Sequence, residues 1–202
     1  LLAVGVTNPS FLAMENIRDI LVKASPALIL GSMMTLVILA REIDISVGSL
    51  MGLCAAVLGI ATSTDRLGLP VGVGVALCLG VGAGVGLLNG VLVSMARIPS
   101  IVVTLGMLTV LRGITELLMG GKWIEKLPPG IRAFGTESAL GIPYSVWMAV
   151  VALLAGIWLT RRTSFGLRIY GLGSSPSAAD LRGINSKRLK LPAFALTGLA
   201  AG

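Results

Sequence analysis

The chain has 202 residues, of which 55% are apolar, 12% are charged and none is histidine, and its formal net charge is +7. Soluble domains carry roughly 25% charged residues, and the mean hydropathy here is +0.95. This composition excludes a disordered chain, a collagen, a disulfide scaffold and an ordinary cytosolic enzyme, and it predicts a polytopic membrane protein.

The first predicted elements lie at the N-terminal end. The chain starts inside an apolar run without Met, so we expect a fragment in which residues 1–7 complete a first membrane span. Residues 8–23 follow as an amphipathic helix, with Asn16, Asp19 and Lys23 on one side and apolar residues on the other. We expect this helix to lie along the outer surface or to cap the bundle.

Long apolar runs predict the membrane spans. A helix needs about 20 mostly apolar residues to cross the hydrocarbon layer, and continuous runs favour helices over the alternating strands of a barrel. We expect an all-α, polytopic transmembrane bundle that forms a single domain over residues 1–202, with about five complete spans and partial spans at both ends. The predicted spans are residues 24–40, 45–64, 67–96 (a tilted helix from near Pro70), 98–119 and 138–160, and a further one starts at 191.

The distribution of basic residues predicts the topology. Seven of the sixteen fall within residues 161–190, which marks a cytoplasmic loop under the positive-inside rule. When the predicted spans are counted back from this loop, residues 41–44 and Arg97 lie on the cytoplasmic side, and residues 65–66 and 120–143 lie on the outer side. Interfacial aromatic residues are expected at the outer boundary: Trp123, Tyr144 and Trp147.

The segment between the first two predicted spans is polar and short. Glu42 and Asp44 alternate with isoleucines, which indicates extended rather than helical backbone. Ser46 or Asp44 is expected to cap the next helix by accepting from N–H groups near Gly48 and Ser49. Two interpretations remain open: a tight turn with an N-cap, or a broken or re-entrant segment that holds a carboxylate near the membrane boundary.

Small residues recur within residues 80–90. Glycine lets helices approach closely in lipid, so we expect two packing rows, and we expect the amide of Asn89 on the same helix to form an interhelical hydrogen bond. Asn89 and Thr104 are also candidate substrate contacts. The glycine rows are Gly80 and Gly84, and Gly82, Gly86 and Gly90.

Arg112 and Glu116 place opposite charges four residues apart on one predicted span. This spacing puts both on one face and predicts an ion pair near the outer end. Lining of a translocation path is the alternative, because membrane charges face protein or water. The candidate gate or path residues are therefore Asp44, Ser46, Asn89, Thr104, Arg112 and Glu116.

Chemical signatures are missing from the sequence. Without histidine there are no Ser–His or Cys–His pairs and no histidine metal ligands. GGKW at 120–123 is no phosphate loop, because it lacks the leading glycine spacing and a Ser or Thr after the lysine. Cys54 and Cys78 lie in uncharged stretches and are expected to be buried. The basic loop has only two aromatic residues, Phe165 and Tyr170, among its charged residues. Single-stranded nucleic acids are bound by basic grooves with several stacking aromatic residues, so this composition argues against nucleic-acid binding. We expect no catalytic residue, metal or cofactor.

The basic loop contains a short predicted helix. Glycine, serine and Pro176 break the structure before it, Ser175 or Ser177 is expected to cap it, and Gly183 ends it. Its small and charged residues suit a groove on a soluble partner. The candidate coupling residues are Ser177, Ala178, Ala179, Asp180, Leu181, Arg182 and Gly183.

Several motifs in order resemble a known family. Ala178, Ala179 and Gly183, followed by LP at 191–192, resemble the EAA loop of permeases in ATP-binding-cassette importers, with Ser177 where Glu is usual. The chain also resembles the ribose, xylose, rhamnose and autoinducer-2 permease family, which carries a G-I-D-L-S-V-G-S stretch and further similar motifs at matching intervals. The matching segments here are REIDISVGS at 41–49, NGVLV at 89–93, IPSIVVTLG at 98–106 and RG at 112–113, and GGKWI at 120–124 with LP at 127–128 is closest to the autoinducer-2 and rhamnose branches.

The resemblance implies a multi-pass subunit of the bacterial inner membrane that imports a monosaccharide-like solute such as rhamnose, autoinducer-2 or ribose. It implies a second permease subunit in a homo- or heterodimeric pore, a periplasmic substrate-binding protein and separate cytoplasmic ATPase subunits that act through the loop at 161–190. The chain itself is then no enzyme. The alternatives are a secondary transporter or channel driven by an ion gradient, which needs a midplane carboxylate in an unwound helix, and a purely structural membrane subunit.

Overall fold

The computed structural model describes residues 13–202, so the expected partial span at 1–7 and the start of the expected surface helix lie outside the described residues. The chain folds into helices joined by short loops, with one small hairpin. The elements are α2 (Met14–Leu39), α3 (Val47–Thr62), α4 (Val71–Ser94), α5 (Ser100–Met119), α6 (Pro129–Thr136), β1 (Ser138–Ala139), β2 (Ile142–Pro143), α7 (Tyr144–Arg162), α8 (Ser164–Ser174), α9 (Pro176–Leu181) and α10 (Ser186–Ala201).

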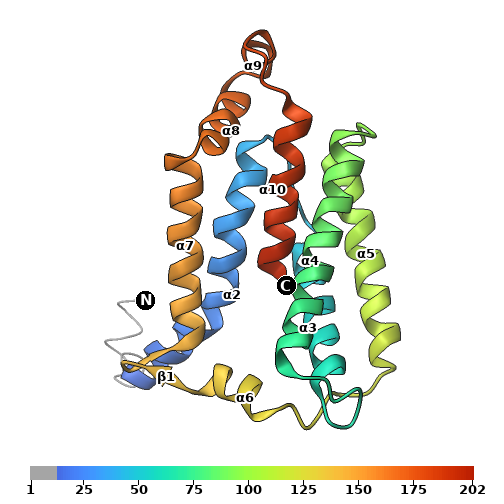
Figure 1. The fold of residues 1–202 in the computed structure, drawn as a ribbon, viewed down its shortest axis with the longest axis vertical. Helices are drawn as coiled ribbons and strands as arrows, with labels where there is room; N and C mark the ends of the chain where they lie inside the picture. Colours follow the sequence, from blue (N-terminus) through green and yellow to red (C-terminus); the bar gives the residue numbers. More distant parts are fainter. Residues whose placement is uncertain (1–12) are drawn as a thin grey trace, which may run out of the picture.

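The helices form a membrane bundle. Within residues 13–202, α2, α4, α5 and α7 are long and apolar enough to cross a bilayer, and α3 is a shorter apolar helix. In Figure 1, α10 lies between α2 and α4, with α7 beside α2 and α5 on the opposite flank. The expected all-α polytopic bundle is confirmed, and α4 begins after Pro70 as predicted.

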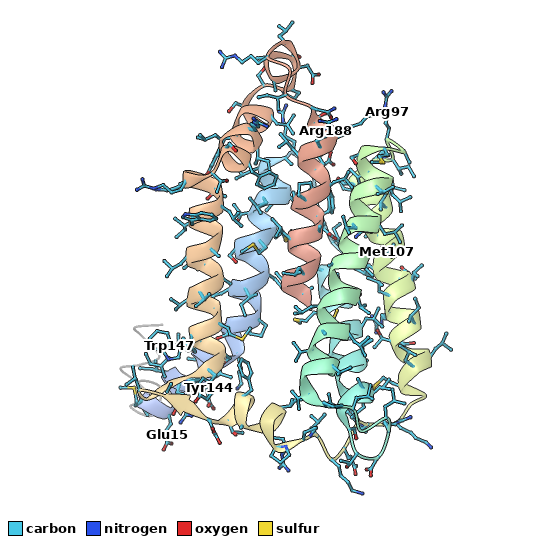
Figure 2. All side chains as sticks on the ribbon, viewed as in Figure 1. Glu15, Arg97, Met107, Tyr144, Trp147 and Arg188 are labelled. Atoms are coloured by element: carbon cyan, nitrogen blue, oxygen red, sulfur yellow. The ribbon has the colours of Figure 1, made fainter. Side chains whose placement is uncertain are left out.

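The loops separate into two ends, as the charge distribution predicts. α8 and α9 project at one end, which we call the elbow end, and the hairpin and α6 lie at the other. Figure 2 shows Arg97 and Arg188 at the elbow end and Glu15, Tyr144 and Trp147 at the opposite end. This alternation matches the predicted topology, in which the elbow end is cytoplasmic.

Two predicted boundaries are wrong. The described part of the expected surface helix is no separate element, because α2 runs unbroken from Met14 through Pro26 to Leu39. Figure 1 shows its first turns inclined to the remainder, and an internal proline bends a helix without ending it when the tertiary structure supports the turn. The expected span at 138–160 begins only at Tyr144.

The hairpin accounts for the late start of α7. Residues 138–143 pair as two antiparallel strands, with Ser138 opposite Pro143. Leu140 and Gly141 at the turn both have positive φ, 55° and 78°, which is the geometry of a two-residue hairpin turn. Trp147 then donates from its indole Nε1 to the carbonyl of Ala139 at 3.2 Å, so the hairpin is held against the start of α7.

The closest helix contact joins α4 to α10. A Cβ added at Gly82 or Gly86 would collide with backbone atoms of Gly198 and Phe194, whereas one added at Gly80 or Gly84 would meet nothing within 4 Å. Only one of the two expected glycine rows, completed by Gly90, therefore faces α10 within the described residues. Close backbone approach supplies the attraction between these helices, since lipid provides no hydrophobic drive.

Candidate functional site

The segment between α2 and α3 descends into the bundle instead of forming a tight surface turn. α2 ends where the N–H groups of Arg41 and Glu42 donate to the carbonyls of Ile38 and Val37, at 2.9 and 3.0 Å. Residues 42–45 then have no helical structure. α3 has 16 residues, or about 24 Å of helix, which is shorter than the hydrocarbon layer of about 30 Å. The extended residues cover the remaining depth, as the re-entrant interpretation requires.

A buried polar network forms where this segment meets α4. The Asp44 Oδ1 atom accepts from the N–H and the hydroxyl of Ser46, at 2.9 and 2.6 Å. The Ser46 hydroxyl in turn accepts from Nδ2 of Asn89 at 3.0 Å. All three residues are at most 2% exposed. The expected interhelical bond of Asn89 is therefore made to Ser46, and Asn89 Oδ1 has no hydrogen-bond partner within the described residues.

The network replaces the expected helix cap. Ser46 occupies the N-cap position of α3, yet no side chain accepts from the first free N–H groups of that helix. The Ser46 hydroxyl donates to Asp44 and accepts from Asn89, and the carboxylate of Asp44 accepts the N–H of Ser46 itself. The expectation that either side chain caps near Gly48 and Ser49 is wrong for this reason.

The α5 helix holds the other side of the segment. The Ser100 hydroxyl accepts from the N–H of Ile43 at 3.2 Å. Thr104 donates from its hydroxyl to the carbonyls of Ser100 and Ile43, at 2.8 and 3.4 Å. The Thr104 side chain is fully buried, and its hydroxyl donates to backbone carbonyls. This geometry gives it a positioning role for residues 43–46.

An ion pair connects the segment to α10. Nζ of Lys190 contacts Oε1 of Glu42, and these side chains are only 23% and 13% exposed. Lys190 lies near the start of α10, and Glu42 lies two residues before Asp44. A cavity of about 360 Å³ opens beside the pair, lined also by Arg97 and Lys187. This ion pair therefore joins α10 to the segment that carries Asp44 and Ser46.

Arg112 and Glu116 lie apart from this network. Their Nε and Oε1 atoms are 3.3 Å apart on α5, and their side chains are 75% and 70% exposed within the described part of the chain. The two charges therefore pair as the spacing predicts, and they face away from the described bundle. The structure does not bring them together with Asp44, Ser46, Asn89 or Thr104.

The elbow, which we define as residues 164–185, is built by local caps. Ser175 accepts the N–H of Ala178 with its hydroxyl at 3.3 Å, and so starts α9. At the other end, the N–H of Gly183 donates to Asp180 and that of Ile184 donates to Ala179, at 2.9 and 3.0 Å. This pair of bonds around a glycine with φ of 73° is the Schellman motif.

The caps hold α9 as a rigid projection at the end of the molecule (Figure 1). Ala179 is buried against the core, whereas the remaining expected coupling residues face outward. Leu181 is 90% exposed and offers an apolar side chain at the tip of the elbow. The outward-facing set is Ser177, Ala178, Asp180, Leu181, Arg182 and Gly183.

Sequence reasoning missed Glu42 and Lys190. The alternation in residues 42–45 marks Glu42 as unusual, but no local pattern connects it to a lysine 148 positions away. Gly198 of α10 was missed as well, although Gly198 and Gly202 repeat the four-residue spacing of small residues that marks the packing row on α4. Within residues 13–202, no three His, Cys, Asp or Glu side chains lie close enough to hold a metal ion.

Comparison with known proteins gives consistent matches. The autoinducer 2 import system permease protein LsrC of Yersinia pestis (strain Pestoides F) is 36% identical over 197 residues, which covers 98% of this chain and 55% of the relative. The protein of the same name from Salmonella paratyphi B (strain ATCC BAA-1250 / SPB7) is 37% identical over 194 residues, covering 96% and 55%. The chain spans about half the length of the curated relatives it matches. No solved structure matches it.

These matches confirm the resemblance drawn from the motifs, and with the apolar helices they identify a multi-pass protein of the inner membrane. The chain belongs to the permease family described as branched-chain amino acid transport system / permease component, which it matches over residues 16–202.

Proposed function

We propose that this chain is the membrane-spanning permease subunit of an ATP-binding-cassette importer for a monosaccharide-like solute. The names of the relatives favour autoinducer 2 over rhamnose or ribose as the solute. The partners in this proposal are cytoplasmic ATPase subunits, a periplasmic substrate-binding protein and a second permease subunit. The chain carries no catalytic residue of its own in this scheme, and ATP hydrolysis takes place in the ATPase.

The observation that carries the proposal is the capped, outward-facing α9. A rigid helix with small residues, one charge and an exposed leucine suits insertion into a groove on a soluble motor. Movement of the elbow reaches the membrane interior through Lys190 and Glu42, because Glu42 begins the segment that bears Asp44 and Ser46. ATP-driven motion of the elbow then shifts the extended segment against α4 and α5.

Charge reversal on α9 tests this coupling. Asp180 is exposed, so Asp180→Arg in the full importer should lower solute uptake at least tenfold and reduce co-purification of the ATPase, while membrane insertion is unchanged. Gly183→Val should act in the same direction, since a β-branched residue is strained at positive φ. Asp19→Arg, an exposed reversal on α2 at the opposite end, is the control for ATPase binding. Full uptake and ATPase binding in both elbow variants would defeat the proposal.

One observation favours a second candidate, a transporter driven by an ion gradient. Asp44 is a buried carboxylate beside extended backbone, which is how such transporters hold a coupling ion. Uptake measured after ATP depletion, and separately after collapse of the ion gradient, distinguishes the two. Uptake that stops with ATP depletion and survives loss of the gradient supports the importer, and the reverse supports the second candidate.

A further inference from the structure

A cavity at the base of the elbow is lined by three arginines from different parts of the chain. Arg168 comes from α8, Arg182 follows α9, and Arg188 lies in the first turn of α10. The cavity has a volume of about 240 Å³ and is completed by Gly183, Ile184, Asn185 and Leu189. The fold therefore gathers guanidinium groups that are up to 20 residues apart in sequence around one space.

The positive charge of this cavity is uncompensated within the described residues. No carboxylate lines it, and the ion pairs found in residues 13–202 join other residues. Asp180 borders the adjoining cavity instead. The Asn185 side chain already accepts the N–H groups of Lys187 and Arg188, so the helix start adds little attraction for a ligand. Any attraction for an anion at this cavity therefore comes from the three arginines.

The position of the cavity fits the membrane boundary rather than the cytosol. α7 ends just before α8 with Arg161 and Arg162. Leu167 and Tyr170, beside Arg168 on α8, are 65% and 42% exposed. Apolar and aromatic side chains next to arginines are typical of a helix at the lipid headgroup level. Figure 2 shows Arg188 below the tip of the elbow, at the level where α10 enters the bundle.

We propose that the arginine cavity binds the phosphate group of an anionic phospholipid from the cytoplasmic leaflet. Guanidinium groups match phosphate oxygens in a bidentate manner, and basic pockets between helices on this side of a membrane attract anionic headgroups. The volume is smaller than the roughly 300–1,000 Å³ of sites for drug-sized molecules, and it suits a headgroup. A soluble partner that approaches the elbow meets α9 before it reaches this cavity.

Native mass spectrometry of the full-length permease tests the site, with phosphatidylglycerol and phosphatidylcholine as probes. The test variant is Arg168→Gln with Arg188→Gln. The matched control is Arg161→Gln with Arg162→Gln, which removes the same charge from the same loop but touches no part of the cavity. Arg182 stays unchanged because it follows α9, so the result does not depend on the coupling proposal.

We expect wild type and control to retain phosphatidylglycerol in preference to phosphatidylcholine. The test variant should lose that retention by at least about tenfold, because it removes two of the three guanidinium groups proposed to hold the phosphate, which the control variant keeps. A second variant, Arg168→Lys with Arg188→Lys, keeps the positive charges and disturbs folding less. It should weaken retention less than the Gln variant, because lysine keeps the charge but lacks the planar guanidinium group that binds phosphate in a bidentate manner. Inorganic phosphate at the same concentration should displace little lipid.

Equal retention of both lipids, or equal loss in test and control variants, would overturn the proposal. Displacement of the lipid by an equal concentration of inorganic phosphate would also overturn it, and would assign the site to the free anion. If the test variant kept its phosphatidylglycerol but lost the ATPase on purification, the arginines would bind acidic residues of a protein and the lipid assignment would be wrong.

Discussion

The elbow and the interior of the bundle are held together in opposite ways. The hydrogen bonds that shape α9 join residues three to five positions apart. In the interior, which we define as residues 42–46 with their contacts on α4, α5 and α10, the bonds from Asn89 to Ser46 and from Thr104 to Ile43 span 43 and 61 positions. Within the elbow, α9 is locally capped and exposed apart from Ala179, whereas the interior depends on the whole fold.

This difference separates two kinds of consequence. A substitution at an exposed residue of α9 removes few buried contacts, so it should stop coupling to a partner while stability is largely kept. A substitution in the interior leaves buried polar atoms or backbone contacts unsatisfied and should lower stability first. If Asp180→Arg destabilised the protein as much as an interior change, the comparison would fail.

The largest effect is expected at the α4–α10 contact. Gly86→Val places a branched side chain against the backbone of Phe194 and Gly198, and backbone cannot move aside as a side chain can. Overpacking of this kind costs about 3 kcal/mol. Unfolding of the purified protein in detergent, followed by tryptophan fluorescence, measures the loss. Gly84→Val, on the same helix with open space around it, should change stability by less than about 0.5 kcal/mol.

The sequence predicts the spans well because their signal is local. Charges and prolines bound each apolar run, so the order of the spans follows directly, whereas the short helices α6 and α8 were not predicted. The same local signal predicts α9, whose caps Ser175 and Gly183 lie within a few residues of the helix. Hydropathy does not separate the hairpin from the span that follows it, because residues 138–143 are uncharged.

The interior is less accessible to sequence reasoning. The alternation at Glu42 and Asp44 fits a surface turn and a re-entrant segment equally, and only the short α3 decides between them. Asn89 is an evident candidate because an amide in a membrane helix needs a partner. Which partner it finds depends on how α4 and the extended segment meet, and no local pattern encodes that.

Breaking the ion pair between α10 and the extended segment should have the next largest effect. Lys190→Met leaves the Glu42 carboxylate, which is 13% exposed, without its cation. We expect a loss of about 2 kcal/mol, less than for a fully buried pair because water still reaches both groups. The exchanged pair Glu42→Lys with Lys190→Glu should recover part of that loss. Lys187→Met is the control, because it removes a neighbouring exposed lysine that forms no ion pair within residues 13–202.

A smaller loss is expected within the polar network. Ser46→Ala removes the acceptor of Asn89 Nδ2 and one donor to Asp44, and we expect a cost of about 1 kcal/mol, as for interhelical hydrogen bonds in membranes. Ser49→Ala, in the first turn of the same helix, removes a hydroxyl with no recorded side-chain bond. In a double-mutant cycle, Asn89→Leu should cost less in the Ser46→Ala background than in wild type. Additive costs would show that the bond contributes nothing.

The smallest effect is expected for the ion pair at the end opposite the elbow. Lys126 contacts Asp65 at 3.0 Å, as close as many strong pairs, but the side chains are 68% and 46% exposed. Water and salt screen such a pair, so Lys126→Gln should change the unfolding free energy by about 0.5 kcal/mol or less. The loop also keeps the bond from the Ser63 hydroxyl to the carbonyl of Glu125 at 2.6 Å. Measured beside Lys190→Met under the same conditions, this variant shows whether burial, rather than the distance between the charged atoms, decides what each ion pair contributes.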